Sequence, residues 1–196
     1  FTTSLVRQGP NNVLYNMLAA AKRNGSNIDF EILTLSPEGE DSRYTEFKAL
    51  GIPITCMEYP AGFSSLFHIR EIEEKIKCMQ PDIVQSANFR PDILLSFMKL
   101  PGVIKLSTMW NCPFDEFTTL FSKRKGAIMS AVLLRRLKQF DAVTACSQFI
   151  VNRVKRNGLH MGIIYTGVDS GYFSPVTAQE RIFARQKLGI ETDDTV

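Results

Sequence analysis

Segments typical of buried strands alternate with segments typical of amphipathic helices along the whole of this 196-residue chain. The strand-like segments are short, rich in apolar and β-branched residues, and bounded by turn formers. They span residues 1–6, 28–35, 52–56, 82–84, 103–108, 140–145 and 161–165. The alternation predicts an α/β architecture built on a mostly parallel sheet of about seven strands, with helices on both faces.

The first strand-like segment leads through a turn at residues 7–12 into a helix-like segment. Asn11 or Asn12 would cap that helix, because a short side-chain oxygen can accept from the unpaired N–H groups of a first turn. A strand, a glycine turn at Gly9 and a helix N-terminus together form an arrangement that binds anions. The single glycine is equally compatible with a sharp strand-to-helix connection and nothing more.

In a parallel sheet the carboxyl ends of the strands meet at one edge, and α/β proteins bind ligands at that edge. Four segments of this chain would meet there. They are the turn at Gly9 and residues 85–90, 110–116 and 166–169. We therefore expect the functional side chains among these segments.

The composition is that of an ordinary globular protein, with 44% hydrophobic and 22% charged residues. The net charge of +3 is too small to imply a nucleic-acid partner, and we expect none. No apolar run is long enough to span a membrane, and no signal segment opens the chain. Residue 1 already lies inside a strand-like segment, so we expect the chain to be a piece of a longer protein.

The four cysteines stand at positions 56, 78, 112 and 146 and form no Cys-x-x-Cys pair. This spacing gives poor support to a zinc site or to thioredoxin-type chemistry. Without a secretory signal, the cysteines are expected to be reduced, in a cytoplasmic protein.

Taken in order, the motifs resemble those of the N-terminal domain of family-4 retaining glycosyltransferases of the GT-B architecture, and of the bacterial capsule and polysaccharide type in particular. The matching stretches are Gly9 to Leu14, Leu33 to Glu38, Pro81 to Val84, Phe89 to Asp92, Phe140 to Ser147, Gly167 to Asp169 with Phe173 and Pro175, and Arg185 with Leu188 to Ile190. The resemblance covers nearly the whole chain in consistent order and spacing.

The resemblance implies that residues 1–196 form a single Rossmann-like domain on the acceptor side. A C-terminal domain that binds the nucleotide sugar would be absent from this chain. The full-length protein would transfer a sugar from a nucleotide-diphosphate sugar to a carbohydrate or lipid-linked acceptor, with retention of anomeric configuration, and this chain alone would be inactive. Gly9, Pro10 and Asn11 would face the donor. No cofactor and no metal are implied.

The chain departs from the family where related enzymes often carry histidine. Gln85 and Ala87 follow the fourth strand-like segment, and Trp110 precedes Asn111 after the fifth. Trp110 cannot take up a proton as imidazole can, although its ring can stack on a sugar and its N–H can donate.

The candidates for a general base are therefore the carboxylates of Asp115 and Glu116. The alternative for these two residues is that one of them only caps the short helix that follows. We expect Asn88, Arg90, Trp110 and Asn111 to bind the acceptor, although Arg90 could equally be a solvated loop residue.

Lys123, Arg124 and Lys125, with Arg135, Arg136 and Lys138, form a basic helical region. Such a region is most simply a solvated helix face. It would also suit peripheral contact with an anionic membrane, which would place the protein at the inner face of the membrane.

Two other functions remain open at this point. A noncatalytic module that binds sugars or nucleotides could have kept the fold and lost the histidines. A nucleotide-cofactor oxidoreductase is less well supported, because it needs three spaced glycines in the first turn and an acidic residue at the end of the second strand.

Overall fold

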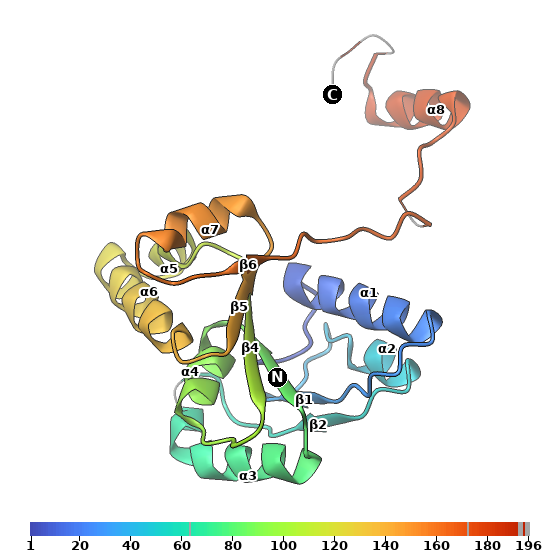
Figure 1. Cartoon of the computed structure of the whole chain (residues 1–196). Helices are drawn as coiled ribbons and strands as arrows, with labels where there is room; N and C mark the ends of the chain where they lie inside the picture. The colour runs from blue at the N-terminus through green and yellow to red at the C-terminus, as the bar shows by residue number, and fades with distance from the viewer. Residues whose placement is uncertain (63, 172, 192–193, 195–196) are drawn as a thin grey trace. The chain divides into compact units, whose positions relative to one another are not determined.

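The computed structural model describes residues 1–62, 64–171, 173–191 and 194, and it divides into two compact units, Phe1–Thr166 and Gly167–Val196. In the described part of the first unit, strands and helices alternate. They run α1(Gly9–Arg23), β1(Ile32–Thr34), α2(Tyr44–Ala49), β2(Ile54–Cys56), η1(Ser64–His68), α3(Ile69–Met79), β3(Ile83–Ala87), α4(Phe89–Phe97), β4(Ile104–Met109), α5(Pro113–Leu120), α6(Lys123–Leu137), β5(Ala142–Ala145), α7(Gln148–Lys155) and β6(Gly162–Ile163) (Figure 1). The α/β class predicted from the sequence is confirmed.

The strands form two parallel sheets among the described residues, with the orders β1–β2 and β3–β4–β5–β6. The N-terminal residues lie between these sheets. Thr2 makes a parallel bridge to Thr34 and donates its N–H to the Leu33 carbonyl at 3.0 Å. On the other side, Ala87 of β3 donates its N–H to the Phe1 carbonyl at 3.4 Å. Backbone hydrogen bonds of residues 1–3 thus join the two sheets.

The predicted first strand over residues 1–6 is absent from the structure, which has only isolated bridges there, at Thr2 and Val6. The chain leaves the sheet after Thr3 because its polar groups find other partners. The Leu5 N–H donates to the Glu38 carboxylate at 2.9 Å, and the Asn11 amide donates to the Ser4 and Val6 carbonyls. Six described strands therefore replace the expected seven.

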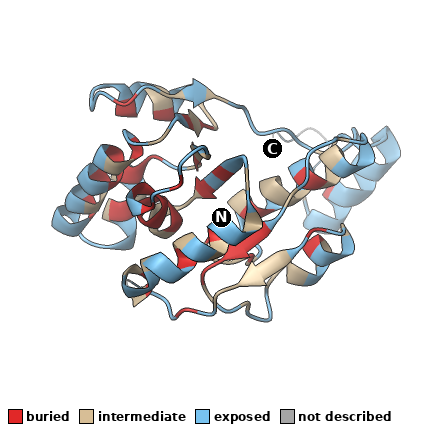
Figure 2. Ribbon diagram, turned by 60° about the horizontal axis from the view of Figure 1, so that its bottom comes forward, coloured by how far each residue is buried: buried red, intermediate tan, exposed pale blue. Residues whose placement is uncertain are grey.

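The helices cover both faces of the strand layer, as the alternation of side chains along β1 shows. Ile32 packs in the cluster that includes Leu18 of α1 and Phe47 of α2. Its neighbour Leu33 packs in the cluster that includes Ile72 of α3. A third cluster joins α5, α6 and α7 to β5. Buried residues accordingly concentrate on the strands and on the inward sides of the helices (Figure 2).

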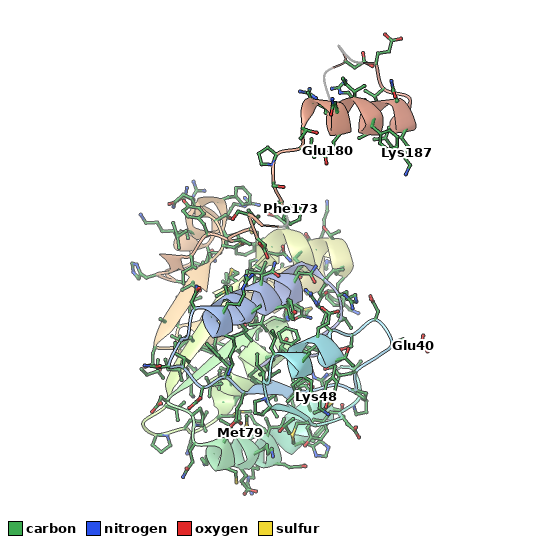
Figure 3. All side chains as sticks on the ribbon, turned by 90° about the vertical axis from the view of Figure 1, so that its right-hand side faces the viewer. Glu40, Lys48, Met79, Phe173, Glu180 and Lys187 are labelled. Carbon is green, nitrogen blue, oxygen red and sulfur yellow. The ribbon has the colours of Figure 1, made fainter. Side chains whose placement is uncertain are left out.

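The described part of the second unit contains one helix, α8(Ala178–Leu188). Thr177 and Glu180 form a capping box, in which each side chain bonds the backbone N–H of the other. Gly189 ends the helix at φ 68°, a left-handed conformation that favours glycine. Glu180 and Lys187 mark the two ends of this helix in Figure 3.

Among the described residues, no helix is both long and apolar enough to cross a membrane. All four cysteines are free thiols.

Gly126 sets the close approach of α5 and α6. A Cβ atom at this position would lie 2.6 Å from the backbone nitrogen of Thr118 and 2.7 Å from the carbonyl carbon of Phe117. Neither backbone atom can move without separating the two helices, so only glycine fits this contact.

We expect Gly126→Ala to lower the free energy of unfolding by about 1–3 kcal/mol, the usual cost of overpacking. Urea unfolding followed by circular dichroism measures the change. Gly39→Ala is the matched control, because nothing lies within 4 Å of a Cβ built there. Equal stability of the two variants would contradict the assigned contact.

A buried carboxyl group holds α4 to the sheet. The hydroxyls of Ser86 on β3 and Ser107 on β4 both donate to Oδ1 of Asp92, at 2.5 and 2.9 Å. Burial raises the pKa of Asp92 from 3.8 to about 7, although both hydroxyls oppose that rise by favouring the carboxylate.

Between about pH 4 and pH 7 the folded protein therefore holds a proton on Asp92 that the unfolded chain has released, so this group makes stability fall as pH rises. Asp92→Asn should remove that loss and be more stable than the parent at pH 8, by on the order of 2–4 kcal/mol. Denaturant unfolding at several pH values measures the difference. A substitution of the exposed Asp82 by Asn should leave the pH dependence of the free energy of unfolding as in the parent. If Asp92→Asn also kept the parent's pH dependence, Asp92 would not be the group responsible for it.

Candidate functional site

The pairing register brings the ends of the central strands to one edge of the sheet. Ala87 of β3 pairs with Thr108 of β4, and Met109 of β4 pairs with Ala145 of β5. Residues 1–3 run parallel to β1 beside them. The segments that follow these ends form what we call the rim, namely residues 4–12, 88–92, 110–116 and 146–148. All the site residues predicted from the sequence belong to the rim, whereas the roles predicted for them stay predictions.

The first rim segment enters α1 at Gly9, with Gln8 as N-cap and Pro10 in the first turn. No side chain caps this helix among the described residues, so the predicted capping by Asn11 or Asn12 is wrong. Asn11 is 2% exposed and its amide donates to the Ser4 and Val6 carbonyls at 3.0 and 2.8 Å. Those bonds fix the turn, because they hold two carbonyls of the chain that leads into it.

Gly9 has no structural reason to be glycine within the described chain. Its φ lies outside the left-handed region, and nothing lies within 4 Å of a Cβ built on it. The N–H of Asn12 bonds the Gln8 carbonyl, while Pro10 has no N–H to offer. The first turn therefore presents an open, unbranched surface at the positive end of the α1 dipole.

Asn88 connects β3 to α4 in a strained conformation. Its φ of 80° and ψ of 156° belong to a region that is essentially restricted to glycine. The Asp92 N–H donates to the Asn88 carbonyl at 3.1 Å, which helps to hold this geometry. Such strain costs about 1–3 kcal/mol and concentrates at functional sites.

The Arg90 guanidinium hydrogen-bonds three other residues of the chain. It donates to the Ser65 hydroxyl at 2.8 Å, to the Ser36 hydroxyl at 2.7 Å and to the Pro60 carbonyl at 2.9 Å. Burial lowers the pKa of Arg90. The side chain thus ties the loop before α3 to the end of β1, so the structure gives it a positioning role, and acceptor binding by Arg90 stays a prediction.

Trp110 and Asn111 follow β4. The indole N–H of Trp110 is buried and has no hydrogen-bond partner among the described residues, which costs about 1–3 kcal/mol. The Trp110 carbonyl accepts from the Cys146 thiol at 3.2 Å, which links the rim segments after β4 and β5. Asn111 is exposed, and its side chain hydrogen-bonds Glu116.

Asp115 and Glu116 lie in the first turn of α5, whose N-cap is Cys112. Neither carboxylate is the cap, so the alternative considered above does not hold. A hydrogen bond from the Cys112 thiol and the Arg153 guanidinium at 3.0 Å lower the pKa of Asp115. Burial raises the pKa of Glu116, against a smaller opposing effect of the Asn111 hydrogen bond.

The two carboxylates are therefore chemically different. Asp115 is a weak base that is held by a cation, whereas Glu116 is half-buried and takes up a proton more readily. Opposite shifts of this kind separate an acid–base group from its charged neighbour. No local pattern in the sequence pointed to Arg153, which reaches Asp115 from α7, the helix after β5.

A shallow pocket on α7 is lined by Phe149, Asn152, Arg153 and Arg156, and none of the predicted site residues lines it.

Neither histidine belongs to the rim. His68 stacks on Tyr59 with ring centroids 4.5 Å apart, a packing role, and His160 lies in the connection between α7 and β6. Gln85 donates to the Thr108 hydroxyl at 2.7 Å. No group of three or more His, Cys, Asp or Glu in the described chain could hold a metal ion.

A comparison with protein families matches residues 7–172 to Glycosyltransferase Family 4. The match covers well over half of the chain, so the chain belongs to this family. A search of curated proteins finds no match to the chain. The donor and the acceptor are therefore matters for proposal.

The strain at Asn88 makes a testable prediction. Asn88→Gly should have a free energy of unfolding about 1–2 kcal/mol higher than Asn88→Ala, because glycine accepts this conformation and alanine does not. Guanidinium unfolding of the two variants gives the difference. A glycine variant that is no more stable than the alanine variant would show that Asn88 is unstrained.

Proposed function

We propose that this chain is the acceptor-side half of a GT-B glycosyltransferase, and that a second domain, outside this chain, binds the nucleotide part of the donor. The complete enzyme transfers a sugar from a nucleotide-diphosphate sugar to a carbohydrate or lipid-linked acceptor, with retention. The observation that carries the proposal is the family match, which spans every rim residue from Gly9 to Glu116. Family membership implies a nucleotide-sugar donor, and it gives no support to the oxidoreductase alternative.

The open first turn of α1 supports the donor side of the proposal. A glycine that the chain itself does not require lies at the positive end of the α1 dipole. A diphosphate or the transferred sugar can approach the backbone closely there. Asn11 acts as a positioning residue, because its amide is occupied by the two carbonyls of the turn.

Glu116 is the proposed general base. The acceptor hydroxyl oxygen bonds to the anomeric carbon on the same face from which the nucleoside diphosphate leaves with the bonding electron pair, as retention requires, and the carboxylate takes the hydroxyl proton. The raised pKa of Glu116 suits this role, and the ion pair with Arg153 keeps the neighbouring Asp115 ionised. Asn111 orients the Glu116 carboxylate.

The acceptor would be bound by Asn88, Asn111 and the ring of Trp110, at the segments after β3 and β4. Arg90 would act indirectly, by holding the loop at Pro60 to Ser65 in place. A bacterial polysaccharide or capsule pathway in the cytoplasm, with a lipid-linked acceptor at the inner membrane face, remains the setting that the sequence motifs predict.

The test of this function is a transfer assay with the protein that carries this chain together with its donor-binding domain. A panel of radiolabelled nucleotide sugars is incubated with saccharide and lipid-linked acceptors, and the anomeric configuration of the product is read by NMR. Transfer with retention supports the proposal, and the chain 1–196 alone should give no turnover. Donor binding without transfer or hydrolysis for any donor would instead favour the noncatalytic module.

Within an active enzyme, Glu116→Gln should lower kcat by about 10²–10⁴-fold, the usual contribution of general base catalysis. Asp115→Asn should cost much less, because Asp115 does not take up the proton. In the parent, kcat/KM should fall toward acid, with an apparent pKa above that of an ordinary Glu. Equal losses in both variants, with an unchanged pH profile, would remove Glu116 from this role.

A further inference from the structure

One face of α7 carries exposed side chains that the site described above does not use. Four of them line a pocket of about 290 Å³, and we call these residues the α7 face: Phe149, Asn152, Arg153 and Arg156. At 100° per residue, the four positions lie within about 100° of one another around the helix axis. Phe149 is 60% exposed, whereas Ile150 and Val154 on the other side of the helix are buried. The buried side therefore holds α7 in place and leaves the α7 face open to solvent.

The charge around the α7 face has one sign. Residues 142–168 contain three Lys or Arg and no Asp or Glu. Among the described residues, the exposed Arg156 forms no ion pair. A guanidinium presents its N–H groups as a planar fork that matches a carboxylate or a phosphate. The α7 face therefore favours an anionic ligand.

Arg153 connects the α7 face to the rim. Its Nη2 atom donates to Oδ1 of Asp115 at 3.0 Å. The two side chains are 52% and 53% exposed, so water screens this ion pair and the pair contributes little to stability. A guanidinium has five N–H donors, so Arg153 can bond Asp115 and a bound anion at the same time. Helix α7 lies beside α5 (Figure 1), and a ligand on the α7 face would therefore be a neighbour of Asp115 and Glu116.

Phe149 and Asn152 add the groups that recognise a sugar ring. The exposed Phe149 ring can stack on the apolar face of a sugar. The side-chain oxygen of Asn152 accepts from Gln148 at 2.9 Å, and its amide N–H groups have no partner in the described part of the chain. Those N–H groups can donate to a hydroxyl oxygen. The pocket volume is close to the lower end of the range for small-ligand sites, about 300–1,000 Å³, which suits one sugar unit.

We infer that the α7 face binds one acidic sugar unit of the acceptor. Arg153 and Arg156 hold the carboxylate or phosphate of that unit, Asn152 donates to one of its hydroxyls, and the Phe149 ring covers its apolar face. A ligand with an apolar ring face, hydroxyls and a negative charge matches all four side chains, which a bare anion does not. The inference narrows the acceptor to saccharides that contain an acidic sugar, and it rests on the proposed function for the statement that this saccharide is the acceptor.

The test is isothermal titration calorimetry of the chain with defined saccharides at low salt. One acidic probe is a tetrasaccharide of alternating glucuronic acid and N-acetylglucosamine, and its neutral counterpart is the tetrasaccharide of N-acetylglucosamine. A second acidic probe, glucose 6-phosphate, shows whether phosphate serves in place of carboxylate. Binding is expected for at least one acidic probe and not for the neutral tetrasaccharide, and it should weaken as salt is raised past about 0.1 M.

Variants of the α7 face separate the charge from the ring. Arg156→Gln should weaken binding about tenfold, because the acidic group loses a charge-assisted hydrogen bond. Phe149→Ala should weaken it about fivefold, because the stacking surface is lost. The matched controls are Arg70→Gln, an exposed cation on α3, and Phe183→Ala, a phenylalanine of α8 that is 69% exposed. Both controls should bind as the parent does, and circular dichroism checks that every variant is folded.

Three results would overturn the inference. They are no binding of either acidic probe, equal binding of the neutral tetrasaccharide, and binding of inorganic phosphate as tight as that of the acidic saccharides, which indicates a site for any anion. The assay contains no nucleotide sugar, so its failure leaves sugar transfer untouched. Conversely, binding of an acidic saccharide by a protein that shows no transfer would remove the proposed function and keep the sugar site on α7.

Discussion

Parallel pairing of β3, β4 and β5 is the constraint on which the rest of this structure depends. Because the three strands run in one direction and end within a residue of one another, the segments after Ala87, Met109 and Ala145 must emerge at the same edge. Residues 1–3 extend that edge by bonding to both neighbouring strands. The buried Asp92 carboxyl, bonded by Ser86 and Ser107, fastens α4 across β3 and β4 beneath the rim.

Polar groups at the rim divide into those that hold the backbone and those that remain available. The side chains of Asn11 and Arg90 donate hydrogen bonds to carbonyls and hydroxyls of neighbouring loops, and these bonds hold the backbone of the rim in place. Gly9 and the Asn111–Glu116 pair do not hold neighbouring loops in this way. This division is what allows an open surface to stay ordered, since a site must be held by residues that do not themselves touch the ligand.

The sequence predicted the alternation of strands and helices, because apolar periodicity and turn residues are local properties of the chain. It overestimated the first strand, since Glu38 captures the Leu5 N–H through a contact between residues far apart in the chain. Arg90 was predicted as a site residue from its loop position, whereas its three hydrogen-bond partners lie on other loops that local sequence patterns do not connect to it. It could not rank Asp115 against Glu116 either, because the distinction comes from Arg153 on α7 and from burial.

The central claim is that the rim at the carboxyl ends of the strands is the face where the sugar is transferred. Amide chemical-shift mapping by NMR tests it directly, by titrating the isotopically labelled chain with nucleotide sugars and with saccharide acceptors. We expect the largest shifts at Gly9, Asn88, Asn111 and Glu116. Shifts confined to the opposite edge of the sheet, at Gly51, Gly102 and Gly158, would contradict it.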